Sequence, residues 1–219
     1  MAAILSVGIA ALDIINEVDG YPTEDSEVRA MDQQVRCGGN AANTAHVLAQ
    51  LGHRTAWAGL WADEPDGRRI ISDLAGHGVD TTPAHRVEYG KSPTSYVTLN
   101  RDNGSRTIVH YRNLPEYDAE AFGRVNLHPY DWVHFEARPN VEAVAAMMRR
   151  VRQEHPQAGI SLEVEKHRDG VERLLETPDA VLFSPDLARA WGFQDPDGLL
   201  DSLDPARVPG LRVCTWGAQ

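Results

Sequence analysis

The sequence is poor in cysteine, in positive charge and in long apolar runs, and each shortage excludes a class of protein. Its two cysteines, Cys37 and Cys214, are far apart, so we predict no disulfide framework. A formal net charge of −11 argues against a nucleic-acid partner, because such binding depends on basic patches. No apolar run is long enough to cross a bilayer and no basic segment precedes the first strand, so we expect no membrane partner, no signal peptide and a cytoplasmic location.

Two further absences exclude two kinds of site. The nine histidines show none of the spacings of a zinc site, and we therefore predict no metal-binding cluster. No Gly-x-Gly-x-x-Gly turn follows the first apolar run, which argues against a dinucleotide-dependent oxidoreductase. What remains is an ordinary globular composition, 42% hydrophobic and 24% charged, over 219 residues, enough for one large domain or one domain with an appendage.

Short apolar runs alternate with helical patterns along most of the chain, and this alternation predicts a parallel sheet covered by helices. The first run ends near Asp13, and a carboxylate after a first strand lies where α/β sheets place their ligand contacts. The apolar residues of the helix expected over 40–51 lie nearly all round it, so we predict that it is buried. The expected strands are 4–10, 55–61, 132–135, 159–164, 181–184 and 213–216, and the other expected helices are 68–77, 140–154 and 185–191.

The segment Arg36-Cys37-Gly38-Gly39-Asn40-Ala41-Ala42-Asn43 is the strongest candidate for a ligand site. Paired glycines permit a tight turn and a close approach of another molecule. Asn40 is a favoured helix cap, and Asn43 lies on the same face of the first turn. From these residues alone, a strand-to-helix turn without a ligand and a polar ligand site both remain open.

A second segment interrupts the alternation. Two β-type runs, 94–100 and 106–111, flank Asn103-Gly104, which predicts a hairpin outside the main sheet, in the manner of a lid. Arg106 opens the second arm, where it is either an exposed edge charge or a functional cation. Glu165 and Lys166 follow the strand over 159–164, and we favour a surface ion pair there over a functional role.

These segments together resemble the PfkB-type, ribokinase-like carbohydrate kinases, and within them the ketohexokinase (fructokinase) branch. The resemblance covers residues 1–219 as one such domain. It rests on Val7-Gly8 with Asp13, Tyr21-Pro22-Thr23-Glu24-Asp25-Ser26-Glu27, the segment 36–43, Asn103-Gly104-Ser105-Arg106-Thr107-Ile108-Val109, Glu163-Val164-Glu165-Lys166 and Val213-Cys214-Thr215-Trp216.

The resemblance implies a three-layer α/β core with a small β-sheet lid built from about 14–36 and 94–111, and a homodimer formed through the lids. It implies an ATP-dependent kinase with Mg²⁺ that phosphorylates a ketose such as fructose. Arg106 would contact the phosphates, where its fixed charge helps the transferring group. The residues implied to bind the sugar hydroxyls are Asp13, Asp25, Gly39, Asn40 and Asn43.

The sequence departs from this family at its C-terminal end. The family's Asp-Thr-x-Gly-Ala-Gly-Asp segment, whose last Asp is the general base, does not occur, so no catalytic residue can be assigned. Residues 217–219 look like the beginning of the nucleotide-binding segment. We therefore expect a C-terminally incomplete kinase without its base and most of its nucleotide site. The alternatives are an inactive short homologue that binds sugar or pairs through the lid, and a relative of the nucleoside kinases.

Overall fold

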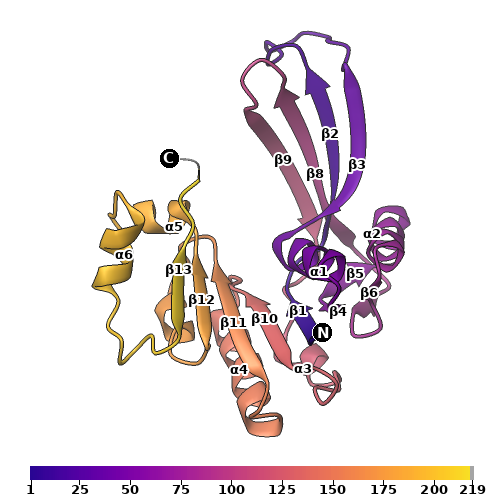
Figure 1. Ribbon diagram of the computed structural model, residues 1–219. Coiled ribbons are helices and arrows are strands. Elements are labelled where there is room, and N and C mark those ends of the chain that lie inside the picture. The colour runs from indigo at the N-terminus through magenta and orange to yellow at the C-terminus, as the bar shows by residue number, and fades with distance from the viewer. Residues whose placement is uncertain (218–219) are drawn as a thin grey trace.

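A parallel sheet of seven strands forms the centre of the molecule in the computed structural model, which describes residues 1–217 (Figure 1). The strand order is β13-β12-β11-β10-β1-β4-β6, and all neighbouring pairs are parallel. The α/β fold with a parallel central sheet is thus confirmed. The strands are β1 (Ala3–Val7), β4 (Arg54–Ala58), β6 (Val79–Asp80), β10 (Trp132–Glu136), β11 (Gly159–Val164), β12 (Ala180–Phe183) and β13 (Leu211–Cys214).

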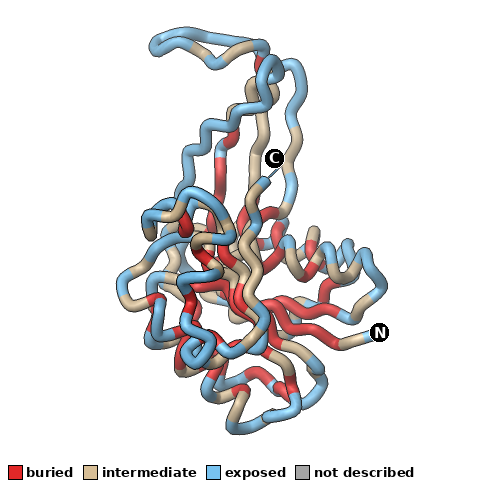
Figure 2. Tube along the Cα trace, turned by 60° about the vertical axis from the view of Figure 1, so that its left-hand side comes forward, coloured by how far each residue is buried: buried red, intermediate tan, exposed pale blue. Residues whose placement is uncertain are grey.

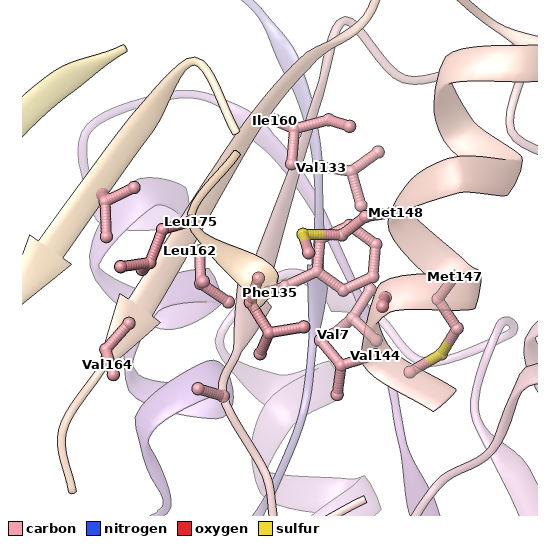
Figure 3. Packing of buried hydrophobic residues seen from close by; sticks show 14 of the residues in the cluster. Val7, Val133, Phe135, Val144, Met147, Met148, Ile160, Leu162, Val164 and Leu175 are labelled. Atoms are coloured by element: carbon pink, nitrogen blue, oxygen red, sulfur yellow. The ribbon is translucent and has the colours of Figure 1, made fainter. Parts of the chain in front are cut away.

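Helices cover both faces of this main sheet. On one face, α1 (Asn40–Gln50) and α2 (Pro65–Gly76) share a core with Trp57 of β4. On the other face, apolar residues of β10 and β11 pack against α4 (Val141–Glu154), as Val133, Phe135 and Met148 show in Figure 3. The same core includes residues of α3 (Ala119–Phe122), the 3₁₀ turn η1 (Val171–Leu174), α5 (Pro185–Ala190) and α6 (Pro196–Ser202).

Successive side chains of a strand point to opposite faces of the sheet, and this alternation determines which side chains lie on the face that α1 covers, called here the α1 face. Val133 and Phe135 of β10 point toward α4, so His134 and Glu136 point to the opposite side. Ile160 and Leu162 of β11 also face α4, which turns Ser161 and Glu163 the other way. Two carboxylates therefore reach the α1 face near the carboxyl ends of neighbouring strands.

A second sheet projects away from the main sheet (Figure 1). Its order is β3-β2-β8-β9; β2 and β8 are parallel and the two outer pairs are antiparallel. We call it the projecting sheet, and much of its length is exposed or half-buried (Figure 2). The predicted hairpin is confirmed. The strands are β2 (Ala11–Val18), β3 (Asp32–Gly38), β8 (Lys91–Asn100) and β9 (Arg106–Asn113), and β5 (Leu60–Ala62) and β7 (His85–Val87) form a separate pair.

The helix α1 is less buried than its composition predicted. Its small residues Ala41, Ala42 and Ala45 are buried, whereas Val47 is 52% exposed and Leu51, just past the helix, is 70% exposed. Alanines let the helix approach the sheet closely, and the larger apolar side chains are on the outer side. The expectation of burial all round was wrong.

Three other boundaries differ from the expectations. The helix expected over 68–77 begins at Pro65, because the Glu64 side chain caps it by accepting from the N–H groups of Asp66 and Gly67. The strand expected over 55–61 is divided by Gly59 into β4 and β5. Asp13 lies inside β2 of the projecting sheet and not at the end of the first strand, which stops at Val7.

Two kinds of feature are absent from the described residues. Within residues 1–217, no helix combines the length and apolar character that a membrane span requires. The same residues contain no group of three or more His, Cys, Asp or Glu side chains placed to hold a metal ion. Ala218 and Gln219, part of the segment compared above with a nucleotide-binding turn, lie outside the described residues.

Candidate functional site

The two glycines before α1 allow three segments to meet. Gly39 precedes the helix with a φ of 95°, and a β carbon there would lie 2.5 Å from the carbonyl oxygen of Ile9. A β carbon on Gly38 would lie 2.1 Å from Oδ2 of Asp13. The predicted tight turn is confirmed, and the groups that approach it closely belong to the chain itself, the β1–β2 connection and the Asp13 carboxylate.

Asn40 does not cap α1, contrary to the prediction. It is the first helical residue, Gly39 takes the cap position, and the cap has no side-chain hydrogen bond. The Asn40 amide nitrogen instead donates to Oε1 of Glu163 at 3.2 Å and to Oε2 of Glu165 at 2.9 Å. Glu165 also pairs with Lys166 at 3.5 Å, so the favoured surface ion pair exists but does not account for all of the contacts of Glu165.

A buried carboxylate lies beside this turn. Glu136 ends β10, accepts the N–H of Ile9 at 2.9 Å and pairs with Arg138 at 2.8 Å. Burial raises the pKa of Glu136, while Arg138 and the Ile9 N–H act in the opposite direction. Burial, followed by the charges of Glu136 and Glu165, raises the pKa of Glu163 to about 7. Near neutral pH Glu163 is therefore only partly ionised.

The base of the projecting sheet adds a row of polar residues. Asp13 of β2 is in register with Arg36 of β3 and Ser95 of β8, and Ser95 is in register with His110 of β9. Ser95 Oγ lies 3.2 Å from Nδ1 of His110. Partial burial and the charges of Arg112 and Arg138 lower the pKa of His110, while Asp13 raises it. Sequence reasoning missed His110, because only the register between strands reveals its place in this row.

The residues proposed from the sequence fall into two groups. Asp13, Gly39 and Asn40 lie together at the glycine turn, and Asn43 is one turn further along α1, exposed, with its backbone N–H bonded to the Gly39 carbonyl at 2.8 Å.

The other two residues lie away from the turn. Asp25 is in the loop that joins β2 to β3, and Arg106 pairs with Leu99 at the far end of the projecting sheet. The strand rise places Arg106 about 13 Å along the sheet from His110.

Sequence reasoning also passed over Glu136. It ends a buried apolar strand, and this position was the signal that could have identified it.

A cavity of about 480 Å³ lies on the α1 face next to Glu163. His134 lines it and hydrogen-bonds through Nδ1 to Ser161 Oγ at 2.8 Å. Burial lowers the pKa of His134 to about 4, so this imidazole is neutral at physiological pH. The cavity therefore combines apolar side chains with neutral and hydroxyl-bearing polar ones. Its lining is Ile4, Thr44, Leu48, Trp132, His134, Ser161, Glu163, Leu182, Phe183, Ser184 and Thr215.

Comparison with known proteins decides the family. The family model described as "pfkB family carbohydrate kinase" matches residues 1–218. This chain belongs to the pfkB family of carbohydrate kinases. Membership places it among the phosphotransferases and confirms the resemblance inferred from the motifs.

Individual relatives agree with this membership. The chain is 36% identical to mouse ketohexokinase over 223 residues, which cover 99% of this chain and 75% of that protein. Two solved structures share the fold. The ribokinase of Giardia lamblia matches with a TM-score of 0.84 at 14% identity, over 100% of this chain and 75% of its own. The Arabidopsis thaliana ribokinase complexed with ribose and ATP matches with a TM-score of 0.74 at 19% identity, over 97% of this chain and 71% of its own.

Proposed function

We propose that this pfkB-family chain serves an ATP-dependent kinase for a ketose such as fructose, and that its own residues form the sugar-binding part. The sequence similarity to mouse ketohexokinase supports the ketose. The observation that carries the sugar site is the contact between Gly38 and Asp13. This contact brings a carboxylate against the turn that begins α1, beside the amide of Asn40.

In this proposal the polar groups at the turn bind the sugar hydroxyls. The Asp13 carboxylate accepts hydrogen bonds from hydroxyl groups, as ionised carboxylates do. Gly39 offers a close backbone approach, and Asn40 and Asn43 offer amides on the first turn of α1. Asp25 is proposed as a further sugar ligand from the family resemblance. It lies outside the cluster, so its contact requires a movement of the projecting sheet or a second chain.

ATP and Mg²⁺ fit the described residues poorly. The proposed phosphate contact, Arg106, is exposed at the far end of the projecting sheet, and residues 1–217 contain no cluster of three or more His, Cys, Asp or Glu side chains placed to hold a metal ion. ATP would supply the transferred phosphoryl group. The printed sequence contains no Asp-Thr-x-Gly-Ala-Gly-Asp segment, so no base is assigned. We propose that this chain binds sugar and that phosphoryl transfer requires that segment in addition.

Calorimetric titration of the chain with fructose, ribose and adenosine tests this proposal. We expect binding of fructose, weaker binding of ribose and none of adenosine. Stronger binding of adenosine would favour a nucleoside kinase relative, and the absence of any sugar binding would contradict the proposal. A coupled assay of ADP release with fructose and ATP should show no turnover by this chain. Fructose-dependent turnover would contradict the proposed requirement for the Asp-Thr-x-Gly-Ala-Gly-Asp segment.

A second candidate role, pairing of two chains through the projecting sheet, is favoured by an apolar row on its other face. Val35, Ile14, Tyr96 and Val109 are in register across the four strands. Tyr96 is 49% exposed and Val109 is 67% exposed. Exposed apolar rows of this kind mark interaction surfaces.

Sedimentation analysis should give a dimer that Val109→Asp converts to a monomer, and a monomeric wild type would contradict this role. A cytoplasmic location is part of the same proposal.

A further inference from the structure

Two glutamates on one strand hold the amide of a residue on another element. Glu163 lies in β11 and Glu165 follows two residues later, so both point to the side where α1 begins. The Asn40 Nδ2 atom donates to Oε1 of Glu163 at 3.2 Å and to Oε2 of Glu165 at 2.9 Å. Both amide hydrogens of Asn40 are thus used inside the protein.

The chemistry of the partners determines which way the Asn40 amide is turned. An ionised carboxylate only accepts hydrogen bonds, so it must face the amide nitrogen and not the amide oxygen. Among residues 1–217, no donor is found within hydrogen-bond distance of Asn40 Oδ1. A free asparagine side chain can both donate and accept hydrogen bonds. The held Asn40 side chain therefore offers a ligand only its acceptor, Oδ1.

We infer that Glu163 and Glu165 are positioning residues that orient the Asn40 amide, so that its oxygen accepts a hydrogen bond from one hydroxyl group of the sugar. The inference rests on the proposed sugar-binding function. The glutamates do not touch the sugar, and they make the site select a hydroxyl over a group without a hydrogen to donate. The segment 163–166 is one of those that carry the resemblance to the ketohexokinase branch, and this inference gives its two glutamates a role in orienting Asn40.

The charges around the pair are compatible with this role. Glu165 is paired with Lys166 at 3.5 Å, and Glu136, which faces Glu163 from β10, is paired with Arg138 at 2.8 Å. Glu163 has the raised pKa described above, and its protonated form still has a carbonyl oxygen that accepts. The protonated form can also donate, so below neutral pH the orientation of the Asn40 amide depends on Glu165.

The test measures discrimination between fructose and its monofluoro analogues, in which one hydroxyl becomes a fluorine that cannot donate. At one position the replacement should weaken binding to the wild-type chain about tenfold, the usual effect of losing one hydrogen bond of this kind. In Glu165→Gln and in Glu163→Gln/Glu165→Gln, the penalty should fall below about threefold, because a glutamine side chain can accept from or donate to Asn40 and no longer fixes which way its amide is turned. Retention of the full penalty in the double variant would overturn the inference.

Two controls separate this role from others. Glu142→Gln, an exposed residue of α4 paired with Arg173, should keep the full penalty. In an Asn40→Ala background, Glu165→Gln should change fructose affinity less than about twofold, since coupled residues are not additive. A full additional loss there would indicate direct sugar contact and overturn the positioning role.

The proposed function can fail separately from this inference. If the wild-type chain binds no sugar, the proposed function fails, and the NMR signals of the Asn40 side-chain amide still report on the contact. A clear shift of those signals in Glu165→Gln supports the held amide. Unchanged signals in this variant would overturn it.

Discussion

The Asp13 carboxylate lies directly against Gly38, so that a β carbon on Gly38 would come within 2.1 Å of Asp13 Oδ2. We therefore predict that Gly38→Ala displaces Asp13 and weakens fructose binding at least about tenfold, because a group proposed to contact the sugar is moved. Calorimetric titration measures this effect. Gly76→Ala is the matched control, since a β carbon there meets no atom within 4 Å, and its affinity should be unchanged. If Gly38→Ala bound fructose as tightly as the wild type does, Asp13 would not be part of the sugar site.

Gly39 carries a stronger constraint of a different kind. Its φ of 95° is unfavourable for any residue with a β carbon, and that carbon would also lie 2.5 Å from the carbonyl oxygen of Ile9. Gly39→Ala should lower the free energy of unfolding by about 2 kcal/mol or more. Urea titration followed by circular dichroism measures the change. A loss below about 0.5 kcal/mol would show that the turn relaxes freely.

Asp13 and Asn43 differ in burial but are assigned the same role. Asp13→Ala and Asn43→Ala should each abolish measurable fructose binding, because each removes a hydrogen-bonding group from the proposed site. Asp102→Ala, in the exposed turn of the β8–β9 hairpin, is the control and should bind as the wild type does. Retained affinity in either variant would remove that residue from the site.

Arg106 lies outside the sugar cluster in this single chain. In a kinase extended with the Gly-Ala-Gly-Asp segment, Arg106→Ala should lower kcat more than it raises the KM for the sugar, because the proposed contact is with phosphate. Steady-state kinetics with varied fructose separate the two constants. A change in KM alone would contradict the phosphate role.

The titration of Glu163 predicts a dependence of stability on pH. Its pKa is about 7 in the folded protein against an ordinary value of 4.5, so the folded state binds the proton more tightly than the unfolded state does. The resulting stabilisation is complete below about pH 4.5 and is lost as the pH rises through 7. Glu163→Gln does not titrate, so its stability relative to the wild type should rise across this window, by about 2 kcal/mol after allowance for partial exposure.

Urea unfolding at pH 5, 6, 7 and 8 measures that difference. Glu142→Gln is again the control, because both partners in its ion pair with Arg173 are largely exposed. Its stability curve should run parallel to that of the wild type. A constant difference between Glu163→Gln and the wild type over this range would show that Glu163 is already ionised at pH 5.

Local patterns in the sequence determined the type of fold and much of the sheet. Strands β10, β11 and β12 and the β8–β9 hairpin were predicted nearly to their ends, because each is a short segment rich in apolar or β-branched residues and bounded by turn residues. The glycine turn was found because only glycine tolerates its backbone and its close contacts. These features depend on residues that are close together along the chain, so they can be identified from the sequence alone.

Contacts between distant segments were decided only by the tertiary structure. Asn40 meets Glu163 and Glu165 across more than 120 positions, and His110 joins the row of Asp13 only through the register of four strands. Asn40 was predicted as a cap because asparagine favours that position locally, but Gly39 takes the cap position and the Asn40 amide nitrogen donates to the two carboxylates. The sequence by itself determined which elements form and where the glycine turn lies, and it indicated the segment of the proposed site. The packing of those elements decided which side chains share it, because hydrogen bonds and burial depend on distance in space and not on distance along the chain.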